Sequence, residues 1–232
     1  CLLLGSAGRA VGQTPIDITC VSLNYTQSFD GLPAAPPYTN AVSVPGWLLD
    51  APANYRGHDA GANATNGIYG YGSGTGGDRA LGSYNLTATV NDFGVIFRNN
   101  SGYPIQAFNI SYFGEQWRMG QYGAGNDQLR FQYLQSAAPI SVITGAGYTN
   151  HAALHFNPPQ NDPTCGPGGT PLDGNLAANR TLIAATLTLP SALNPGDYIA
   201  FRWRDPIGSC NGHGMAVDDV NIEAVIVGPP TG

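Results

Sequence analysis

Carboxylates near the C-terminal end of the sequence are the first groups that could do chemistry. In the segment HGMAVDDVNIEAV, Asp218 has the same alternation parity as the apolar residues Val220, Ile222 and Ala224. In a strand this parity would turn Asp218 toward the core. An ionised carboxylate cannot remain there unpaired. Two interpretations therefore stay open: an arginine pair or a turn-capping role, or a bound calcium or sodium ion for which Asp218 is a candidate ligand.

Glutamate is rare in this sequence, and one of the two glutamates lies beside an aromatic residue and an arginine. Glu115 belongs to the segment GEQWR, and Arg118 and Arg202 lie on segments that a sandwich would bring close to it. A single glutamate among arginines indicates a structural ion pair, which would lower the pKa of the carboxyl group. A catalytic general acid needs the opposite shift, so we expect these three residues to stabilise the fold.

A glycine-rich segment, residues 54–79, carries several aromatic side chains. Tyr55, Tyr69 and Tyr71 lie in this segment, and Trp47 lies shortly before it. Aromatic rings beside glycine and asparagine can stack on sugar rings or fill a protein–protein contact, and they can equally pack the inside of a folded loop. The sequence predicts these four residues as ligand-binding candidates and leaves internal packing as the alternative.

Composition argues against several classes of function. All nine basic residues are arginine, and the formal net charge is −6. Nucleic acids and anionic membranes select clustered positive charge, so we expect neither as a partner. No apolar run reaches the roughly 18–20 residues of a membrane span. The motifs G-x-S-x-G and E-x-D-x-E are both absent, which leaves little support for a hydrolase.

The four cysteines, Cys1, Cys20, Cys165 and Cys210, allow three disulfide pairings. An even number of cysteines in a lysine-free chain rich in Thr, Asn and Gly favours an oxidising, extracellular or cell-surface location. Cys165 and Cys210 are the preferred pair because both lie in Gly/Pro-rich loops of the C-terminal half. Cys1 is expected either to pair with Cys20 or to carry a lipid.

Alternation of apolar and polar residues predicts strands along the whole chain and no helix of three turns. The predicted strands include residues 93–98, 108–113, 129–133, 182–189, 199–204 and 220–226. About ten strands joined by Gly/Pro-rich loops indicate an all-β, two-sheet sandwich. We expect a leader at residues 1–22, a single domain at residues 23–228, and long loops at residues 54–79 and 157–180.

Six segments together resemble the MAM-like jelly-roll modules of bacterial secreted and surface proteins. They are SFDGLP (28–33), GDRALGS (77–83), FNISYFGEQWRMG (108–120), LDGN (172–175), FRWRD (201–205) and HGMAVDDVNI (213–222). The resemblance covers residues 24–226 and implies a jelly-roll sandwich whose first and last strands are neighbours. That arrangement would place Asp30 near Asp218, and Asp78 and Asp219 complete the candidate calcium site. The resemblance implies no catalytic chemistry.

These observations favour an extracellular, non-enzymatic protein with a structural or adhesive role. An extended leader at residues 1–22 would add a strand to the edge of a second copy, which predicts a self-assembling filament. A carbohydrate-binding module that recognises cell-surface glycans is the alternative, and a hydrolase is the least supported class.

Overall fold

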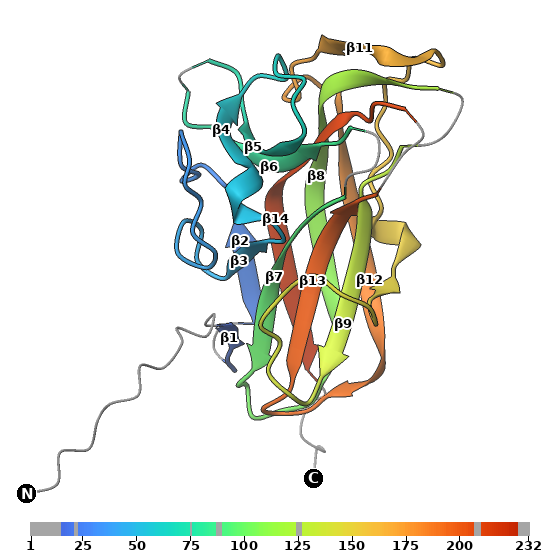
Figure 1. Cartoon of the computed structure of the whole chain (residues 1–232). Coiled ribbons are helices and arrows are strands. Elements are labelled where there is room, and N and C mark those ends of the chain that lie inside the picture. Colours follow the sequence, from blue (N-terminus) through green and yellow to red (C-terminus); the bar gives the residue numbers. More distant parts are fainter. Residues whose placement is uncertain are drawn as a thin grey trace, which may run out of the picture.

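The structure is a computed structural model that describes residues 15–20, 23–74, 76–86, 90–123, 127–206 and 210–226. Two β-sheets lie face to face around one main hydrophobic core (Figure 1). Helical structure in the described residues is confined to two 3-10 turns, η1 (Pro52–Asn54) and η2 (Ala152–Leu154). No helix in this part of the chain is long and apolar enough to cross a membrane.

The smaller sheet has six strands in the order β1-β7-β13-β9-β10, with β3 also paired to β7. The strands are β1 (Ile16–Ile18), β3 (Trp47–Leu49), β7 (Asn91–Asn99), β9 (Arg130–Ser136), β10 (Thr149–Asn150) and β13 (Tyr198–Asp205). Strand β1 runs parallel to β7, and the other pairs are antiparallel. This sheet therefore has short strands at both of its edges.

The larger sheet has eight strands in the order β11-β8-β14-β6-β5-β4, with β12 also paired to β8 and β2 to β14. The strands are β2 (Asn24–Gln27), β4 (Tyr55–Asp59), β5 (Gly67–Tyr71), β6 (Ala80–Tyr84), β8 (Ile105–Tyr122), β11 (Cys165–Pro171), β12 (Arg180–Leu193) and β14 (Gly214–Ile226).

The two long strands β8 and β14 change partners along their length. Residues 105–115 of β8 pair with β12, and residues 118–122 pair with β11. Residues 214–217 of β14 pair with β6, and residues 220–223 pair with β2. The pairing of β14 with β8 shifts register between Asp218 and Asn221, at the point where β14 changes partner. At one end of the larger sheet, β8 and β14 therefore pair with β11 and β6. At the other end they pair with β12 and β2.

Period-two alternation explains how the two sheets form one core. Phe93, Val95 and Phe97 of β7 and Phe201 and Trp203 of β13 are all fully buried. They pack against the inward residues of the larger sheet; the Phe108 and Phe201 rings, for example, lie 5.1 Å apart. Burying each such side chain contributes about 1.5–3 kcal/mol. The two-sheet sandwich expected from the sequence is confirmed.

Three expectations about the strands need correction. Residues 16–18 of the expected leader form β1, which pairs with β7 of the same molecule. Residues 54–79 are not one long loop, because β4 and β5 lie within them and extend the larger sheet. Residues 157–180 likewise contain β11. Glycine lowers strand propensity, which is why these segments read as loops in the sequence.

Candidate functional site

An open depression with a mixed polar and apolar lining crosses the outer face of the larger sheet, and we call it the sheet groove. Its main part has a volume of about 380 Å³ and is lined by Asn109, Ile110 and Ser111 of β8, Ala184, Ala185 and Thr186 of β12, and Asn221 and Glu223 of β14. A second hollow of about 250 Å³ shares Asn221 and is lined by Thr26, Gln27, Ser28, Asp219 and Val220. The sheet groove therefore spans four neighbouring strands, β12, β8, β14 and β2.

The same alternation that builds the core also builds the sheet groove. On β8, Phe108, Ile110 and Tyr112 are buried in the core, so Asn109 and Ser111 turn outward. On β12, the inward residues are equally apolar, whereas the outward ones in the groove are small alanine and threonine side chains. Short outward side chains leave the backbone face uncovered, which is why the sheet is hollow here.

Polar side chains in the sheet groove form a row across three strands. Thr186, Asn109 and Glu223 are cross-strand partners in register. The Thr186 hydroxyl donates to Asn109 Oδ1 at 2.8 Å, and Asn109 Nδ2 donates to Glu223 Oε2 at 3.0 Å. Two large apolar side chains on the same face, Leu182 and Val225, are 59% and 38% exposed. The row is held in place while its remaining donors and acceptors face solvent.

The predicted aromatic ligand-binding residues lie elsewhere, and the structure corrects this expectation. Trp47, Tyr55, Tyr69 and Tyr71 are all buried to within 1% of full burial, so none can contact a ligand at the surface. Trp47 stacks on Trp203, and its indole N–H donates to Tyr25. The hydroxyls of Tyr55 and Tyr69 donate to backbone carbonyls. The internal-packing alternative describes these side chains.

A second, smaller core explains why two of these tyrosines are buried. Tyr69 stacks on Tyr71, and Tyr71 stacks on Trp117, on the outward side of β5, β6 and β8. Segment 172–179 packs over Trp117: Leu172 donates its N–H to the Trp117 carbonyl, and a side chain at Gly174 would collide with the indole ring. This cover occupies one end of the outer face and leaves the sheet groove open at the other.

The predicted ion pair between Glu115 and the arginines at 118 and 202 is also corrected. The nearest cation to Glu115 is Arg180, whose Nε lies 3.7 Å from Oε1, and the Trp117 indole N–H donates to Oε2 at 3.0 Å. Arg118 instead donates to the carbonyls of Gly61, Ala62 and Gly169. Burial dominates the electrostatics and raises the pKa of Glu115 to about 7, opposite to the expected direction.

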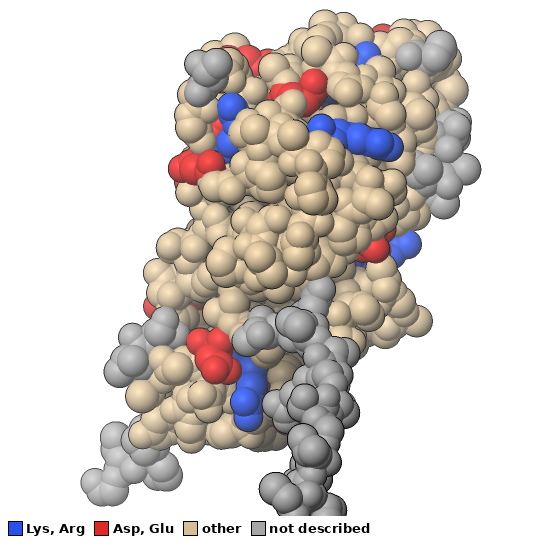
Figure 2. Space-filling view, turned by 60° about the vertical axis from the view of Figure 1, so that its left-hand side comes forward, with Lys and Arg blue, Asp and Glu red and all other residues tan. Residues whose placement is uncertain are grey.

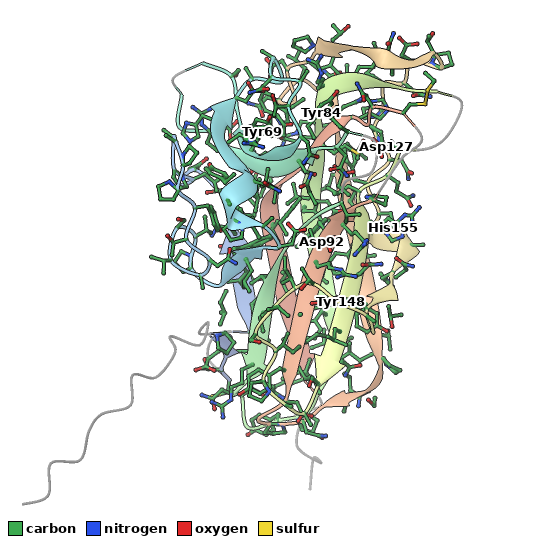
Figure 3. The ribbon with its side chains drawn as sticks, in the orientation of Figure 1. Tyr69, Tyr84, Asp92, Asp127, Tyr148 and His155 are labelled. Atoms are coloured by element: carbon green, nitrogen blue, oxygen red, sulfur yellow. A yellow bond between two sulfur atoms is a disulfide. The ribbon has the colours of Figure 1, made fainter. Side chains whose placement is uncertain are left out.

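Arg202 belongs to a different cluster on the outer face of the smaller sheet. Its guanidinium lies 3.4 Å from Asp92, donates to Gln132 and to the Ile143 carbonyl, and covers the Tyr148 ring at 3.7 Å. Figure 3 shows Asp92 and Tyr148 in the central part of the smaller sheet. Burial raises the pKa of Asp92 to about 6, although Arg202 and Arg204 oppose the shift.

The predicted calcium residues are close enough to influence one another but are not gathered into a metal site. Asp218 is 3% exposed, and its Oδ1 accepts no hydrogen bond. Burial raises its pKa to about 8, and Glu115, Asp219 and Asp78 add to the shift. Asp30 instead accepts hydrogen bonds from the backbone N–H of Arg79 and from the Ser28 hydroxyl. In the described ranges no three carboxylate, histidine or cysteine side chains converge at metal-binding distance.

Cys165 and Cys210 form a disulfide, which is the pairing preferred from the sequence. It ties β11 to the segment that precedes β14. Cys20 is exposed and forms no disulfide with another described residue. Cys1 lies outside the described residues, so its predicted pairing or lipidation stays a prediction.

The residues of the sheet groove were not singled out in the sequence. Asn109, Ser111 and Thr186 occupy the polar positions of predicted strands, where side chains usually face solvent without a specific role. The sequence feature that could have indicated the groove is the short length of the outward side chains. At the groove positions of β8 and β12 these are asparagine, serine, alanine and threonine instead of arginine or other long residues. Only the register of β8, β12 and β14 shows that these positions are neighbours.

Comparisons with known proteins identify no family for the chain. No family model and no curated protein sequence matches the chain. Among solved structures, it is similar to the K3 cleaved adhesin domain of Lys-gingipain from Porphyromonas gingivalis, with 16% identity over 86% of this chain and 98% of that one, and a TM-score of 0.44.

Two further similar structures are carbohydrate-binding modules. The xylan-binding domain of a Paenibacillus barcinonensis protein has 8% identity over 93% of this chain and 99% of that one, with a TM-score of 0.37. The C-terminal family 22 module of a Clostridium thermocellum protein has 13% identity over 86% of this chain and 92% of that one, with a TM-score of 0.40.

Proposed function

We propose that the chain is an extracellular, non-enzymatic binding module that holds a neutral carbohydrate chain in the sheet groove. The observation that carries this proposal is the groove itself. It is open, it crosses four strands, and its polar lining consists of amide, hydroxyl and carboxylate groups. Sugar hydroxyls both donate and accept hydrogen bonds, so a surface that offers both kinds of partner is complementary to them.

Charge selects against an anionic ligand. The groove lining contains Asp219 and Glu223 and no arginine, and the whole sequence contains no lysine. On the face that Figure 2 draws, most of the surface is uncharged, and the few charged side chains are of both signs. An acidic polysaccharide or a phosphate group would meet two carboxylates without a compensating cation. Neutral sugar hydroxyls can donate to those carboxylates instead.

The arrangement of the two carboxylates supports binding rather than hydrolysis. Glu223 lines the main part of the groove, whereas Asp219 lines the second hollow. Glycosidases instead hold two carboxyl groups about 5–9.5 Å apart around one glycosidic bond. A disulfide is consistent with the extracellular location. Strand exchange through residues 1–22 stays a prediction: residues 16–18 pair with β7 of their own molecule, and residues 1–14 lie outside the described part of the chain.

A pair of matched substitutions tests the proposal. Ala184→Arg fills the main part of the groove from an exposed position, and Thr188→Arg adds the same side chain to an exposed position farther along β12, outside the groove lining. Binding is measured on an array of neutral and acidic glycans and then by calorimetry. We expect the wild type and Thr188→Arg to bind the same neutral glycan and Ala184→Arg to lose it. Equal binding by both variants, or no binding by the wild type, would overturn the proposal.

A further inference from the structure

One end of the sandwich interior is polar instead of apolar. Asp205 of β13 and Asn91 of β7 are cross-strand partners. They have the inward parity of Trp203 and Phe93, and both are fully buried. Ser83, on β6 of the opposite sheet, donates its hydroxyl to Asp205 Oδ2 at 2.7 Å. These side chains therefore bridge the two sheets where an apolar core would be expected.

Asp127 closes this polar end from the segment between β8 and β9. It is 3% exposed, and its carboxylate accepts the backbone N–H groups of His213 at 2.6 Å and Gln128 at 2.9 Å. Any side chain at Gly212 would lie 2.8 Å from Asp127 Oδ2 and 3.4 Å from the Asn85 carbonyl. Asn85 in turn donates to the Asp205 carbonyl at 2.7 Å. Figure 3 shows Asp127 at the same end of the sandwich as Tyr84, the neighbour of Ser83 and Asn85.

Two oxygen atoms in this polar end have no donor. Asp205 Oδ1 and Asn91 Oδ1 are fully buried and accept no hydrogen bond, whereas the Asn91 amide nitrogen donates to Asn85 Oδ1. The second oxygen belongs to a neutral amide, so it cannot be satisfied simply by protonating its own side chain. A buried acceptor without a donor costs about 1–3 kcal/mol. The geometry thus leaves two acceptors, on adjacent strands, that face the same interior region.

No ion pair compensates the carboxyl groups in this region. Neither Asp127 nor Asp205 has an arginine guanidinium or a histidine ring nitrogen within 4 Å among the described residues, although Arg130 acts on Asp127 from farther away. Both carboxyl groups are buried. His213 Nδ1 accepts the Gly120 N–H, so this ring nitrogen does not donate to either carboxyl group. A cation bound between the two carboxyl groups would supply the missing positive charge.

We propose that a calcium ion binds at this end of the sandwich, between Asp205 and Asp127, with Asn91 Oδ1 as a neutral ligand. All available donors are oxygens, which suits a hard cation and disfavours zinc. Calcium accepts irregular sets of six to eight oxygens, whereas magnesium requires an octahedron and retains several waters. A divalent ion also balances the two carboxylates. This site is separate from the acidic residues around Asp218.

Calcium titration of the chelator-treated protein tests the site. We expect one calcium per chain by calorimetry, no comparable binding of magnesium, and a rise in melting temperature of about 5–10 °C at a calcium concentration 100 times Kd. Asp205→Asn keeps the acceptor for Ser83 but removes one charge, so its affinity should fall at least tenfold. Asp218→Asn is the matched control, and it should bind calcium as the wild type does.

Two outcomes overturn the proposal. One is a wild type that calcium neither binds nor stabilises, which would mean that a proton alone neutralises the pair. The other is calcium binding that survives Asp205→Asn and is lost in Asp218→Asn. If Asp205→Asn and Asp127→Asn both fail to fold, Tb³⁺ replaces calcium in the wild type. Crystals grown with it should give one anomalous peak beside Asp205 and Asp127, and a peak elsewhere would refute the site.

Discussion

Replacing Asp218 by asparagine should stabilise the protein at alkaline pH. Asp218 Oδ1 is buried without a donor, and Glu115, Asp219 and Asp78 surround it with like charge. In the variant, the amide oxygen can keep the hydrogen bond from the Asp219 N–H, and the amide nitrogen can occupy the position of Oδ1. The amide N–H groups of the asparagine would then face Glu115, Asp219 and Asp78, where the wild type presents the acceptor oxygen Asp218 Oδ1.

The expected size follows from the shift in the Asp218 pKa, from 3.8 to about 8. A raised pKa means that the unfolded chain releases this proton near pH 4 while the folded chain keeps it until pH 8. Folding stability from this group is complete below pH 4 and is lost as the pH rises through 8. The shift corresponds to about 6 kcal/mol at most, so we expect Asp218→Asn to gain about 3–6 kcal/mol at pH 9 and almost nothing at pH 4.

Urea unfolding at pH 4, 6 and 9, in the presence of a chelator, measures this effect. Asp219→Asn is the control, because Asp219 is exposed and asparagine tolerates its positive φ of 48°. We expect the control to gain less than about 1 kcal/mol at pH 9, because it removes only one of the three like charges that add to the shift in the Asp218 pKa. A gain below about 1 kcal/mol in Asp218→Asn at pH 9 would refute the reasoning. If added calcium stabilises the wild type and Asp218→Asn abolishes that effect, the calcium site predicted from the sequence is correct.

Three further predictions concern other buried groups. Glu115→Gln should raise the free energy of unfolding at pH 9 by up to about 3 kcal/mol and change it little at pH 4, because the Glu115 pKa is raised from 4.5 to about 7; urea titration at both pH values checks this. Arg202→Met should cost about 3–5 kcal/mol, measured by the same method, because it leaves Asp92 buried with only the partly exposed Arg204; a loss below 1 kcal/mol would contradict the assigned pair. Replacing Cys165 and Cys210 together by serine should cost about 4 kcal/mol, because the bond closes a loop of 45 residues; calorimetry of the variant tests the loop-entropy argument.

The sequence predicted the sandwich well where alternation was strong. Residues 93–98, 199–204 and 220–226 lie in β7, β13 and β14, and their apolar positions face the core. Glycine-rich strands such as β5 (GIYGY) were not predicted, because both faces of β5 are buried and its composition is typical of a loop. Their stability comes from packing against Trp117 and β6, which no local pattern records.

The candidate site was less predictable because it depends on register. The burial of Asp218 was predicted correctly, because it follows from the alternation parity alone. The partner of Glu115 could not be predicted, because Arg180 lies close to Glu115 only through the pairing of β12 with β8. Parity also does not show how deeply a side chain lies, so the sequence could not show that Tyr69 and Tyr71 are buried in the second core. The polar end around Asp205 combines residues up to 122 positions apart in the chain.

The position of β14 in the larger sheet has a consequence for how the chain folds. β14 is the last strand that the structure describes, yet it lies between β8 and β6 and also pairs with β2. During synthesis, β2 and β6 cannot join β8 in this sheet until residues 214–226 have been made, because only β14 connects them to β8. Contacts between such distant segments make folding slow. Unpaired strand edges remain exposed meanwhile, so a chain interrupted before residue 214 is prone to aggregate.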